Sequence, residues 1–345
     1  MAEETIRIGF VGAGANTRDR HIPGFQAIEG VELVSVSNRS AESSQRVADQ
    51  FGIPTVYPNW VDLVEADDTD AICIGTWPYM HCIATLAAIE SGKHVLTEAR
   101  MAMNSAEART MLEASLMDPD LITQIVPAPH TLEVDSTIRE MIANGYLGDI
   151  LSIDLVSQGG FIDYDAPMHW RNDRDLSGFN MMHMGIWYEA MMRWVGPAAG
   201  VMALTKVNVK SRKDEAGETR FITVPDHLEI VCEMESGPIA HIRISQVTGL
   251  PPADAVWLFG TEGTLKLDSA TMTLYGGRRG DDKLSKIDIP AAKRGGWRVE
   301  EEFISAIRGN EKVTHTSFQD GVRYMEFTEA VARSAQSRKM VRLPL

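Results

Sequence analysis

Three residues have side chains that could take part in catalysis, and each is predicted to lie beside a ligand site: His183, Arg100 and Tyr79. An unperturbed histidine has a pKa of about 6.5, so His183 can accept and release a proton near neutral pH. Tyr79 can also carry a proton, whereas the guanidinium of Arg100 stays protonated and is suited to polarising an oxygen or holding a carboxylate. These residues predict acid/base chemistry on a small molecule. The alternatives are a structural histidine and an arginine exposed at the start of a helix.

The first strand-like run, residues 6–12, breaks into Gly12–Ala13–Gly14, and Ala15 follows. Two glycines allow a tight turn and a close approach of the backbone to a pyrophosphate, while the start of the next helix supplies amide donors. The third glycine of the usual pattern would fall at Thr17 and is absent. Gly12, Gly14 and Ala15 are therefore predicted to bind a dinucleotide, and an ordinary strand–helix turn is the alternative.

The second strand-like run ends in Asn38, Arg39 and Ser40. An acidic residue at this place would favour NAD, because it accepts a hydrogen bond from the ribose 2′-hydroxyl. A neutral amide beside an arginine and a serine suits a 2′-phosphate better. The sequence therefore predicts NADP, and NAD is the alternative if Arg39 merely stacks on the adenine.

Five strand-like runs alternate with helical stretches at the start of the chain, at residues 6–12, 32–38, 70–76, 94–98 and 121–128. Short apolar strands separated by helices predict a parallel sheet covered on both faces. Such sheets bind ligands beyond the carboxyl ends of their strands. Residues at those ends are accordingly predicted to contact the cofactor: Thr76, Trp77, His81 and Glu98.

The pattern changes after about residue 130, where long runs with alternating polarity predict antiparallel strands, and the last stretch is helical. The predicted fold class is α/β. A parallel-sheet dinucleotide-binding domain covers 1–125. An α+β substrate-binding domain with a large, open, mostly antiparallel sheet covers 126–345. As an alternative within this prediction, its C-terminal helices pack on the first domain. An uncovered sheet face invites a partner, so we predict a homodimer or homotetramer.

Ring and donor side chains gather in the second domain, and they would suit a polyhydroxylated substrate. The predicted substrate-binding residues are His130, His169, Trp170, Arg171 and Trp187. A core position is the alternative for both tryptophans, and Trp187 shares helical spacing with Met184 and Met191. No metal site is predicted, because no pair of histidines has the spacing of metal ligands on one helix or strand.

The net charge of the chain indicates which classes of molecule it would not bind. The 345 residues carry a formal net charge of −15, and 44% of them are hydrophobic. This charge would repel nucleic acid and acidic membranes, so neither is predicted as a partner. Three unpatterned cysteines and an acidic start without a signal peptide predict a cytoplasmic protein, and no apolar run is long enough for a membrane helix.

A set of motifs in order along the chain resembles the Gfo/Idh/MocA oxidoreductase family. The motifs are GFVGAGA (9–15), VSVSNRS (34–40), DAICIGTWPYMH (70–81), GKHVLTEARMA (92–102), NGYLGDI (144–150), the stretch 169–187, and GTEGTL (260–265). The resemblance implies a Rossmann-type domain followed by an α/β domain with an open sheet. It also implies hydride transfer between a nicotinamide and a carbohydrate-like alcohol, in a soluble oligomer.

The sequence departs from the family's motifs where a proton would move. The family's Glu-Lys-Pro is Glu98–Ala99–Arg100 here, and His183 and Trp187 stand in place of an aspartate and a histidine. Because Ala99 cannot carry a proton as the family's lysine would, Glu98 is predicted to contact the nicotinamide ribose and Arg100 to polarise the substrate, and His183 is the predicted acid/base. Two alternatives stay open: a glycoside hydrolase or lyase that oxidises its substrate transiently with a bound cofactor, and a dinucleotide-binding regulator without turnover.

Overall fold

The computed structural model describes residues 5–129 and 133–345. The chain divides into two units, one of residues 1–127 with 298–325 and one of residues 128–297 with 326–345. Residues 298–325 thus belong to the first unit. The sequence prediction placed them in the second domain, with packing on the first domain as the alternative. Among the described residues, no helix has the length and low charge that crossing a membrane requires.

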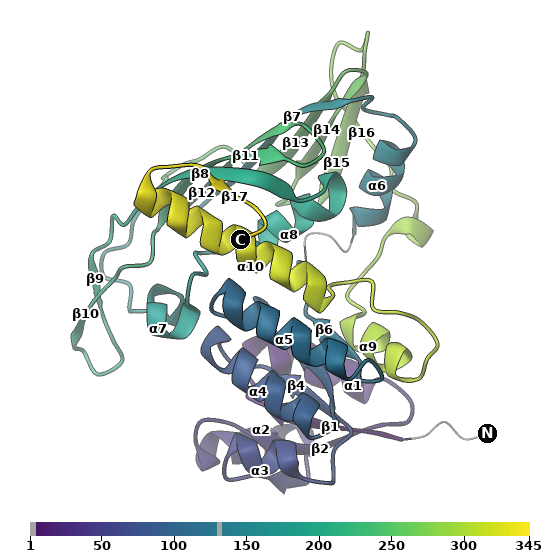
Figure 1. Cartoon of the computed structure of the whole chain (residues 1–345), viewed down its shortest axis with the longest axis vertical. Helices are drawn as coiled ribbons and strands as arrows, with labels where there is room; N and C mark the ends of the chain where they lie inside the picture. Colours follow the sequence, from purple (N-terminus) through teal and green to yellow (C-terminus); the bar gives the residue numbers. More distant parts are fainter. Residues whose placement is uncertain (1–4, 130–132) are drawn as a thin grey trace. The chain divides into compact units, whose positions relative to one another are not determined.

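The first unit contains a six-stranded, fully parallel sheet (Figure 1). Its strands are β1 Ile6–Val11, β2 Val31–Ser37, β3 Thr55–Val56, β4 Ala71–Ile74, β5 His94–Thr97 and β6 Thr123–Ile125. The order is β3-β2-β1-β4-β5-β6, so the chain runs outward from β1 in one direction and then in the other. Adjacent loops diverge at such a reversal, and the crevice between them is the usual ligand site.

Helices cover this sheet, and capping residues fix their ends. They are α1 Ile22–Gln26, α2 Ala41–Phe51, α3 Trp60–Glu65, α4 Pro78–Glu90, α5 Ser105–Met117 and α9 Val299–Ile307. The side chain of Ser40 accepts from the backbone N of Ser43 at the start of α2, and Gly52 ends that helix with a φ of 70°. Gly92 has the same left-handed φ of 70° just after Ser91, the residue that caps α4.

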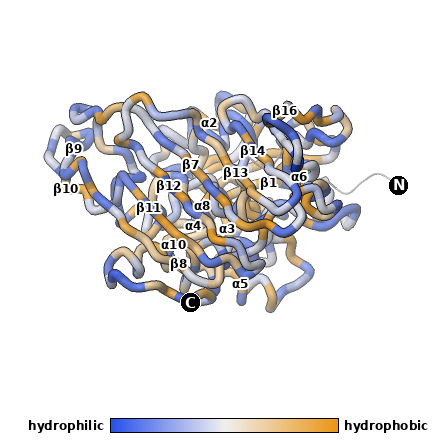
Figure 2. The backbone as a smooth tube through the Cα atoms, turned by 90° about the horizontal axis from the view of Figure 1, so that it is seen from above, coloured by the Kyte–Doolittle hydropathy of each residue, from blue (hydrophilic) through white to orange (hydrophobic). Residues whose placement is uncertain are grey.

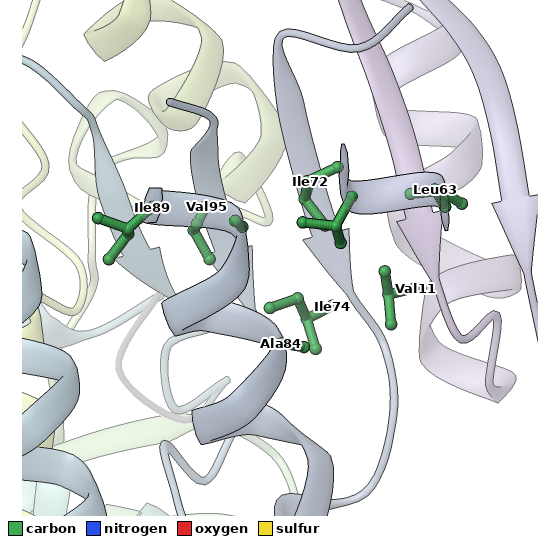
Figure 3. Packing of buried hydrophobic residues seen from close by; sticks show 9 residues of the cluster. Val11, Leu63, Ile72, Ile74, Ala84, Ile89 and Val95 are labelled. Atoms are coloured by element: carbon green, nitrogen blue, oxygen red, sulfur yellow. The ribbon is translucent and has the colours of Figure 1, made fainter. Parts of the chain in front are cut away.

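One core cluster of the first unit lies between the sheet and helices α3 and α4 (Figure 3). Ile72, Ile74 and Val95 are fully buried, and Val11 is 1% exposed. Burial of each such side chain contributes about 1.5–3 kcal/mol to folding. The alternation of short apolar strands and helices in the sequence is therefore confirmed. The pattern does not reveal β3 and α3, and residues 17–21 form a π-helical turn before α1.

The second unit contains a nine-stranded sheet in the order β16-β15-β14-β13-β7-β12-β11-β8-β17. Every pairing in it is antiparallel except β7 with β12, which confirms a mostly antiparallel sheet. The strands are β7 Ile150–Gln158, β8 Ala198–Lys206, β11 His227–Met234, β12 Ile239–Ser245, β13 Ala255–Gly260, β14 Gly263–Asp268, β15 Thr273–Arg278, β16 Ser285–Lys286 and β17 Val341–Arg342. A separate hairpin comprises β9 Ser211–Lys213 and β10 Thr219–Phe221.

Helices pack on one face of the nine-stranded sheet (Figure 1). They are α6 Asp135–Ala143, α8 Met184–Val195 and the later part of α10 Phe318–Ser337, with the short α7 Arg174–Ser177 beside the hairpin. The rings of Tyr188 and Phe327 stack with centroids 3.6 Å apart, and Ser334 Oγ accepts from the backbone N of Ala203. Hydrophobic and hydrophilic segments follow one another along β7, β12 and β13 (Figure 2), as expected for strands with one buried face.

Candidate functional site

A cavity of about 490 Å³ opens in the first unit beyond the carboxyl ends of β1, β2 and β4. It lies at the reversal of strand order, where a ligand is expected. Seven of the residues predicted to bind the cofactor line this cavity: Gly12, Gly14, Asn38, Arg39, Ser40, Thr76 and Trp77. Tyr79, a predicted catalytic residue, lines it too. Ala15, His81 and Glu98 are not among its lining residues.

The turn after β1 needs its first glycine. Gly12 has a φ of +80°, and a Cβ built on it would lie 2.5 Å from Cγ2 of Thr76. A Cβ on Gly14 would lie 3.2 Å from the carbonyl oxygen of Gly75. The two glycines thus let the β1 turn pack against the β4 turn while the backbone stays open to the cavity.

Asn38 braces the glycine turn. Its Oδ1 accepts from the backbone N of Ala13 at 2.6 Å, and its Nδ2 donates to the carbonyl oxygen of Ser43 at 3.0 Å. Its own backbone N donates to Ser44 Oγ at 2.8 Å. Asn38, which the sequence predicts to bind the cofactor, thus lines the cavity and also joins the turn after β1 to α2.

Positive charge dominates the lining of the cavity. Arg18, Arg39 and Arg46 line it together with Ser40 and Ser43, and none of the lining residues is acidic. The guanidinium of Arg39 lies 5.7 Å from the ring centroid of Trp77. Arg46 Nη1 pairs with Glu42 at 2.5 Å, and both side chains are exposed. Three guanidinium groups and two hydroxyls form a set that suits a phosphate group.

Glu98 follows β5 and belongs to a buried ionic cluster. Its Oε1 accepts from Asn16 Nδ2 at 2.5 Å and lies 3.1 Å from Nε2 of His21. The other nitrogen of His21, Nδ1, bonds to Oε1 of Glu300 on α9. Burial lowers the pKa of His21, but the hydrogen bonds to the two glutamates outweigh it and raise that pKa to about 9. Burial raises the pKa of Glu98, yet the bond to His21 and its charge leave it below the ordinary value.

Arg100 is 3% exposed, and α5 begins only at Ser105. This placement excludes the alternative of an exposed residue at a helix start. The peptide bond between Ala99 and Arg100 is cis. His81 is fully buried, and its Nδ1 and Nε2 lie 2.9 Å and 3.1 Å from the carbonyl oxygens of Arg100 and Thr76. His81 therefore ties the end of β5 to the end of β4.

His183 immediately precedes α8 in the second unit. Its Nε2 lies 2.9 Å from Oγ of Ser157 on β7. Ser157 Oγ also donates to Oδ2 of Asp254 at 2.8 Å, and Oδ1 of Asp254 accepts from the backbone N of Gln158 at 2.7 Å. The predicted acid/base thus stands at the end of a hydrogen-bonded chain of three side chains.

The predicted substrate residues fall into two groups. His169, Trp170 and Arg171 lie together: Nδ1 of His169 accepts from the backbone N of Arg171, whose guanidinium is 4.2 Å from the ring centroid of Trp170. Trp187 is 3% exposed within α8, which favours the core alternative over contact with a substrate. His130 lies outside the described residues.

Several residues of these sites were absent from the sequence prediction. Arg18 and His21 stand in the short segment after the glycine turn, and their proximity to that turn was an available signal. Arg46 was detectable as a residue of the helix that follows Ser40. Ser157, Asp254 and Glu300 carry no sequence signal, because their partners are distant along the chain.

All three cysteines, Cys73, Cys82 and Cys232, are free and buried. Burial raises the pKa of the Cys82 thiol to about 11 and that of Cys232 to about 12. Within residues 5–129 and 133–345, no group of three or more His, Cys, Asp or Glu side chains is arranged to hold a metal ion. Two candidate sites thus stand out among the described residues: the cavity of the first unit and the hydrogen-bonded side chains of His183, Ser157 and Asp254 in the second.

Family comparison adds to this geometry. Residues 6–116 match a model described as the oxidoreductase family with an NAD-binding Rossmann fold, and residues 136–266 match the GFO/IDH/MocA C-terminal domain. The chain belongs to the Gfo/Idh/MocA oxidoreductase family. The two matches together span well over half of the chain, and the family that the sequence motifs resemble is confirmed.

Individual members of the Gfo/Idh/MocA family are distant from this chain. It is 24% identical to dTDP-3,4-didehydro-2,6-dideoxy-alpha-D-glucose 3-reductase of Streptomyces antibioticus, over 98% of this chain and 99% of that protein. It is 28% identical to Glycosyl hydrolase family 109 protein 1 of Bacteroides thetaiotaomicron, over 66% of this chain and 49% of that protein. Other curated relatives are matched over 56% and 35% of their length.

A solved structure shares the whole fold. Levoglucosan dehydrogenase in complex with NADH and levoglucosan superposes with a TM-score of 0.88 at 19% identity, covering 99% of this chain and 100% of that one. At this identity the likeness establishes the fold alone.

Proposed function

We propose that this oxidoreductase transfers a hydride between NADP and a CH–OH group of a sugar, cyclitol or related polyhydroxy compound. The cavity at the strand-order reversal carries this proposal, because it combines the glycine turn with three arginines and no carboxylate. Glu98 would hold the nicotinamide ribose, and its lowered pKa keeps it an ionised acceptor. The cofactor supplies the hydride chemistry, and the chain's residues bind, orient and move protons.

His169, Trp170 and Arg171 support a polyhydroxylated substrate. Their arrangement offers an aromatic face, a guanidinium and an imidazole within one short turn. Relatives whose names specify an activity include dTDP-3,4-didehydro-2,6-dideoxy-alpha-D-glucose 3-reductase and Inositol 2-dehydrogenase, and these names are in keeping with a polyhydroxylated substrate. We propose His183 as the proton acceptor for the substrate hydroxyl and Arg100 as the group that polarises a substrate oxygen, with Tyr79 as a further acid/base candidate beside the cofactor.

The function is tested by incubating the purified protein with a panel of sugars and cyclitols and following both NADPH absorbance and products. Net dehydrogenation changes absorbance in step with product. Transient oxidation by a bound cofactor is the second candidate, which the similarity to a family 109 glycosyl hydrolase favours. It would give product without an absorbance change. Cofactor binding with neither signal would point to a regulator and contradict the proposal.

Replacing Arg39 by alanine is expected to weaken NADP binding by roughly 10–100-fold and to leave NAD binding nearly unchanged. A hydrogen bond to a charged group contributes about 1.5–3 kcal/mol, and Arg39 would make that bond to the 2′-phosphate, which NAD lacks. Calorimetric titration of both cofactors measures the two dissociation constants. Arg20→Ala is the matched control, because Arg20 is exposed on the adjoining turn and does not line the cavity. Tighter binding of NAD than NADP by the wild type, with no effect of Arg39→Ala on NADP, would contradict the preference.

The second unit supports an oligomer through the open face of its sheet. The face opposite the helices exposes Met202, Leu204, Val231 and Ile239, each between 44% and 56%. Val231 on β11 pairs with Met202 on β8, while Leu204 stands opposite Glu229 and Ile239 opposite Glu233. Exposed apolar side chains on an uncovered sheet face invite a partner, and we propose a dimer or tetramer that covers this face.

Leu204→Lys is expected to shift the protein toward monomers, because a charge would have to be buried at the proposed interface. Light scattering coupled to size exclusion gives the mass of the variant and of the wild type. Leu116→Lys provides the control, since Leu116 is 68% exposed on α5 of the first unit and is no part of the nine-stranded sheet. A wild type that is monomeric at micromolar concentration would overturn this part of the proposal.

A further inference from the structure

His21 lies between two glutamates that reach it from distant parts of the first unit. It ends the π-helical turn of residues 17–21, Glu98 follows β5, and Glu300 belongs to the first turn of α9. The side chain of His21 is fully buried, and that of Glu300 is 3% exposed. A buried charge costs free energy unless it is paired and hydrogen bonded, so the placement of Glu300 depends on the histidine that faces it.

The packing of α9 on α1 sets the position of Glu300. The ring of Phe303 on α9 contacts that of Phe25 on α1 with centroids 6.4 Å apart, and Phe25 in turn contacts Phe10 of β1 at 6.1 Å. A Cβ on Gly24 would lie 2.7 Å from Oε2 of Glu300, so this glycine leaves the space that the carboxylate occupies. Glu300 is therefore held beside His21 by helix packing and not by a loop.

The hydrogen bonds of His21 require its cationic form. Nε2 lies 3.1 Å from Oε1 of Glu98, and Nδ1 bonds to Oε1 of Glu300. An ionised carboxylate can only accept, and a neutral imidazole donates from one nitrogen alone, so two carboxylates are both satisfied only by an imidazolium. Burial lowers the pKa of His21, but its hydrogen bonds to Glu300 and Glu98 raise that pKa to about 9, in agreement with the cationic form near neutral pH.

The two oxygens of the Glu98 carboxylate have different surroundings. Oε1 faces His21 and also accepts from Asn16 Nδ2 at 2.5 Å. Oε2 accepts from the backbone N of Ala99 at 3.2 Å, which is its one hydrogen bond among residues 5–129 and 133–345. A carboxylate oxygen can accept two hydrogen bonds, so Oε2 keeps an acceptor site for a ligand.

Glu98 also stands next to the end of β4, because its backbone N donates to the carbonyl oxygen of Ile74 at 3.0 Å, and Thr76 just beyond lines the cavity. We propose that His21 and Glu300 are positioning residues that fix Oε1 of Glu98 and leave Oε2 to accept from the hydroxyls of the nicotinamide ribose. This inference rests on the proposed function, in which Glu98 holds that ribose. It predicts that the two positioning residues affect one half of the cofactor and not the other.

The test therefore separates the two halves of the cofactor. Adenosine 2′,5′-bisphosphate has the adenine and the 2′-phosphate of NADP but lacks the nicotinamide ribose. His21→Gln is expected to raise the dissociation constant of NADP by roughly 10–100-fold, the usual contribution of a hydrogen bond to a charged group, and that of the bisphosphate by less than about twofold. NAD and ADP should show the same difference, because NAD carries the same ribose. Calorimetric titration measures all four constants.

Glu300→Gln tests the outer carboxylate and covers the case in which His21→Gln does not fold. The amide has the size of the carboxylate but no charge, and it should raise the dissociation constant of NADP by roughly tenfold, as the loss of an outer partner of a binding group typically does. Glu302→Gln is the matched control, because Glu302 also lies on α9, is 2% exposed and faces another histidine, with its Oε1 3.3 Å from Nδ1 of His315. The control should bind NADP as the wild type does.

A double-mutant cycle shows whether Glu300 acts through Glu98. Glu98→Gln alone should raise the dissociation constant of NADP by roughly 10–100-fold, and the addition of Glu300→Gln should cause no further loss. If the two losses add, or if Glu300→Gln weakens NADP and the bisphosphate alike, the positioning role is overturned.

These outcomes are distinct from a failure of the proposed function. A wild type that binds neither NADP nor NAD contradicts the function itself. Binding of NADP that Glu98→Gln leaves unchanged removes Glu98 from the ribose, and the inference fails with that assignment. If Glu302→Gln weakens NADP as much as Glu300→Gln does, the effect is a general loss of packing at α9, which also overturns the inference.

Discussion

His183→Gln should lower turnover by roughly 10²–10⁴-fold, the usual contribution of a positioned acid or base. Glutamine is close to histidine in size, and its amide can still donate to Ser157, but it cannot take a proton. The cavity that we propose for NADP is formed by residues of the first unit, so the dissociation constant of NADP should not change. Steady-state kinetics on the substrate found by the panel, together with a cofactor titration, measures both quantities.

A comparison with His169→Gln sharpens this test. His169 lies in the second unit beside Trp170, and we propose that it binds substrate. Its loss should raise the Michaelis constant more than it lowers kcat, because such a contact is made in the ground state and the transition state alike. If His183→Gln kept full turnover, the proton acceptor would have to be sought elsewhere, with Tyr79 first because it lines the cofactor cavity.

The first unit was largely predictable from the sequence because its signals are local. The alternation of short apolar strands and helices identifies a parallel sheet, and such a sheet places Gly12, Arg39 and Thr76 at one edge. Asn38, predicted at the same edge, lines the cavity, and the sequence did not reveal that its side chain also holds the backbone of Ala13. The sequence can place a residue at the end of a strand, because the order of strands and helices is a local pattern. It does not reveal which backbone atom the side chain bonds, because that depends on the exact geometry of the turn after β1.

Residues that act through distant partners were beyond the reach of the sequence. Ser157 appears only as a buried position of an alternating strand, and Asp254 as a loop residue before another strand. Their contact depends on β13 lying next to β7, 97 residues apart along the chain at this point. The same holds for Glu300, which reaches His21 from a helix that we had assigned to the other domain.

His21 gives the second large expected effect, on stability. The pKa of His21 is about 9 in the folded protein and about 6.5 when unfolded, so the folded state holds an extra proton between these values. The stability due to this group is fully present below pH ~6.5 and is lost as pH rises through ~9. The difference corresponds to about 3 kcal/mol, and the free energy of unfolding should fall by about 1.4 kcal/mol for each pH unit within that window.

His21→Gln tests this linkage because it leaves Glu98 and Glu300 without their shared cation. Breaking a buried ion pair by removing one partner costs about 3–5 kcal/mol, and we expect a loss of that size at pH 6.5. The loss should shrink toward pH 9, where the wild type also gives up its proton. Urea unfolding at a series of pH values measures both trends. His94→Gln is the control: burial lowers the pKa of His94, so it should not alter the slope above pH 7. If the free energy of unfolding depended on pH in the same way for the wild type and His21→Gln, His21 would be neutral in the folded protein. Glu98, which we propose as the ligand of the nicotinamide ribose, would then lack a cationic partner in His21.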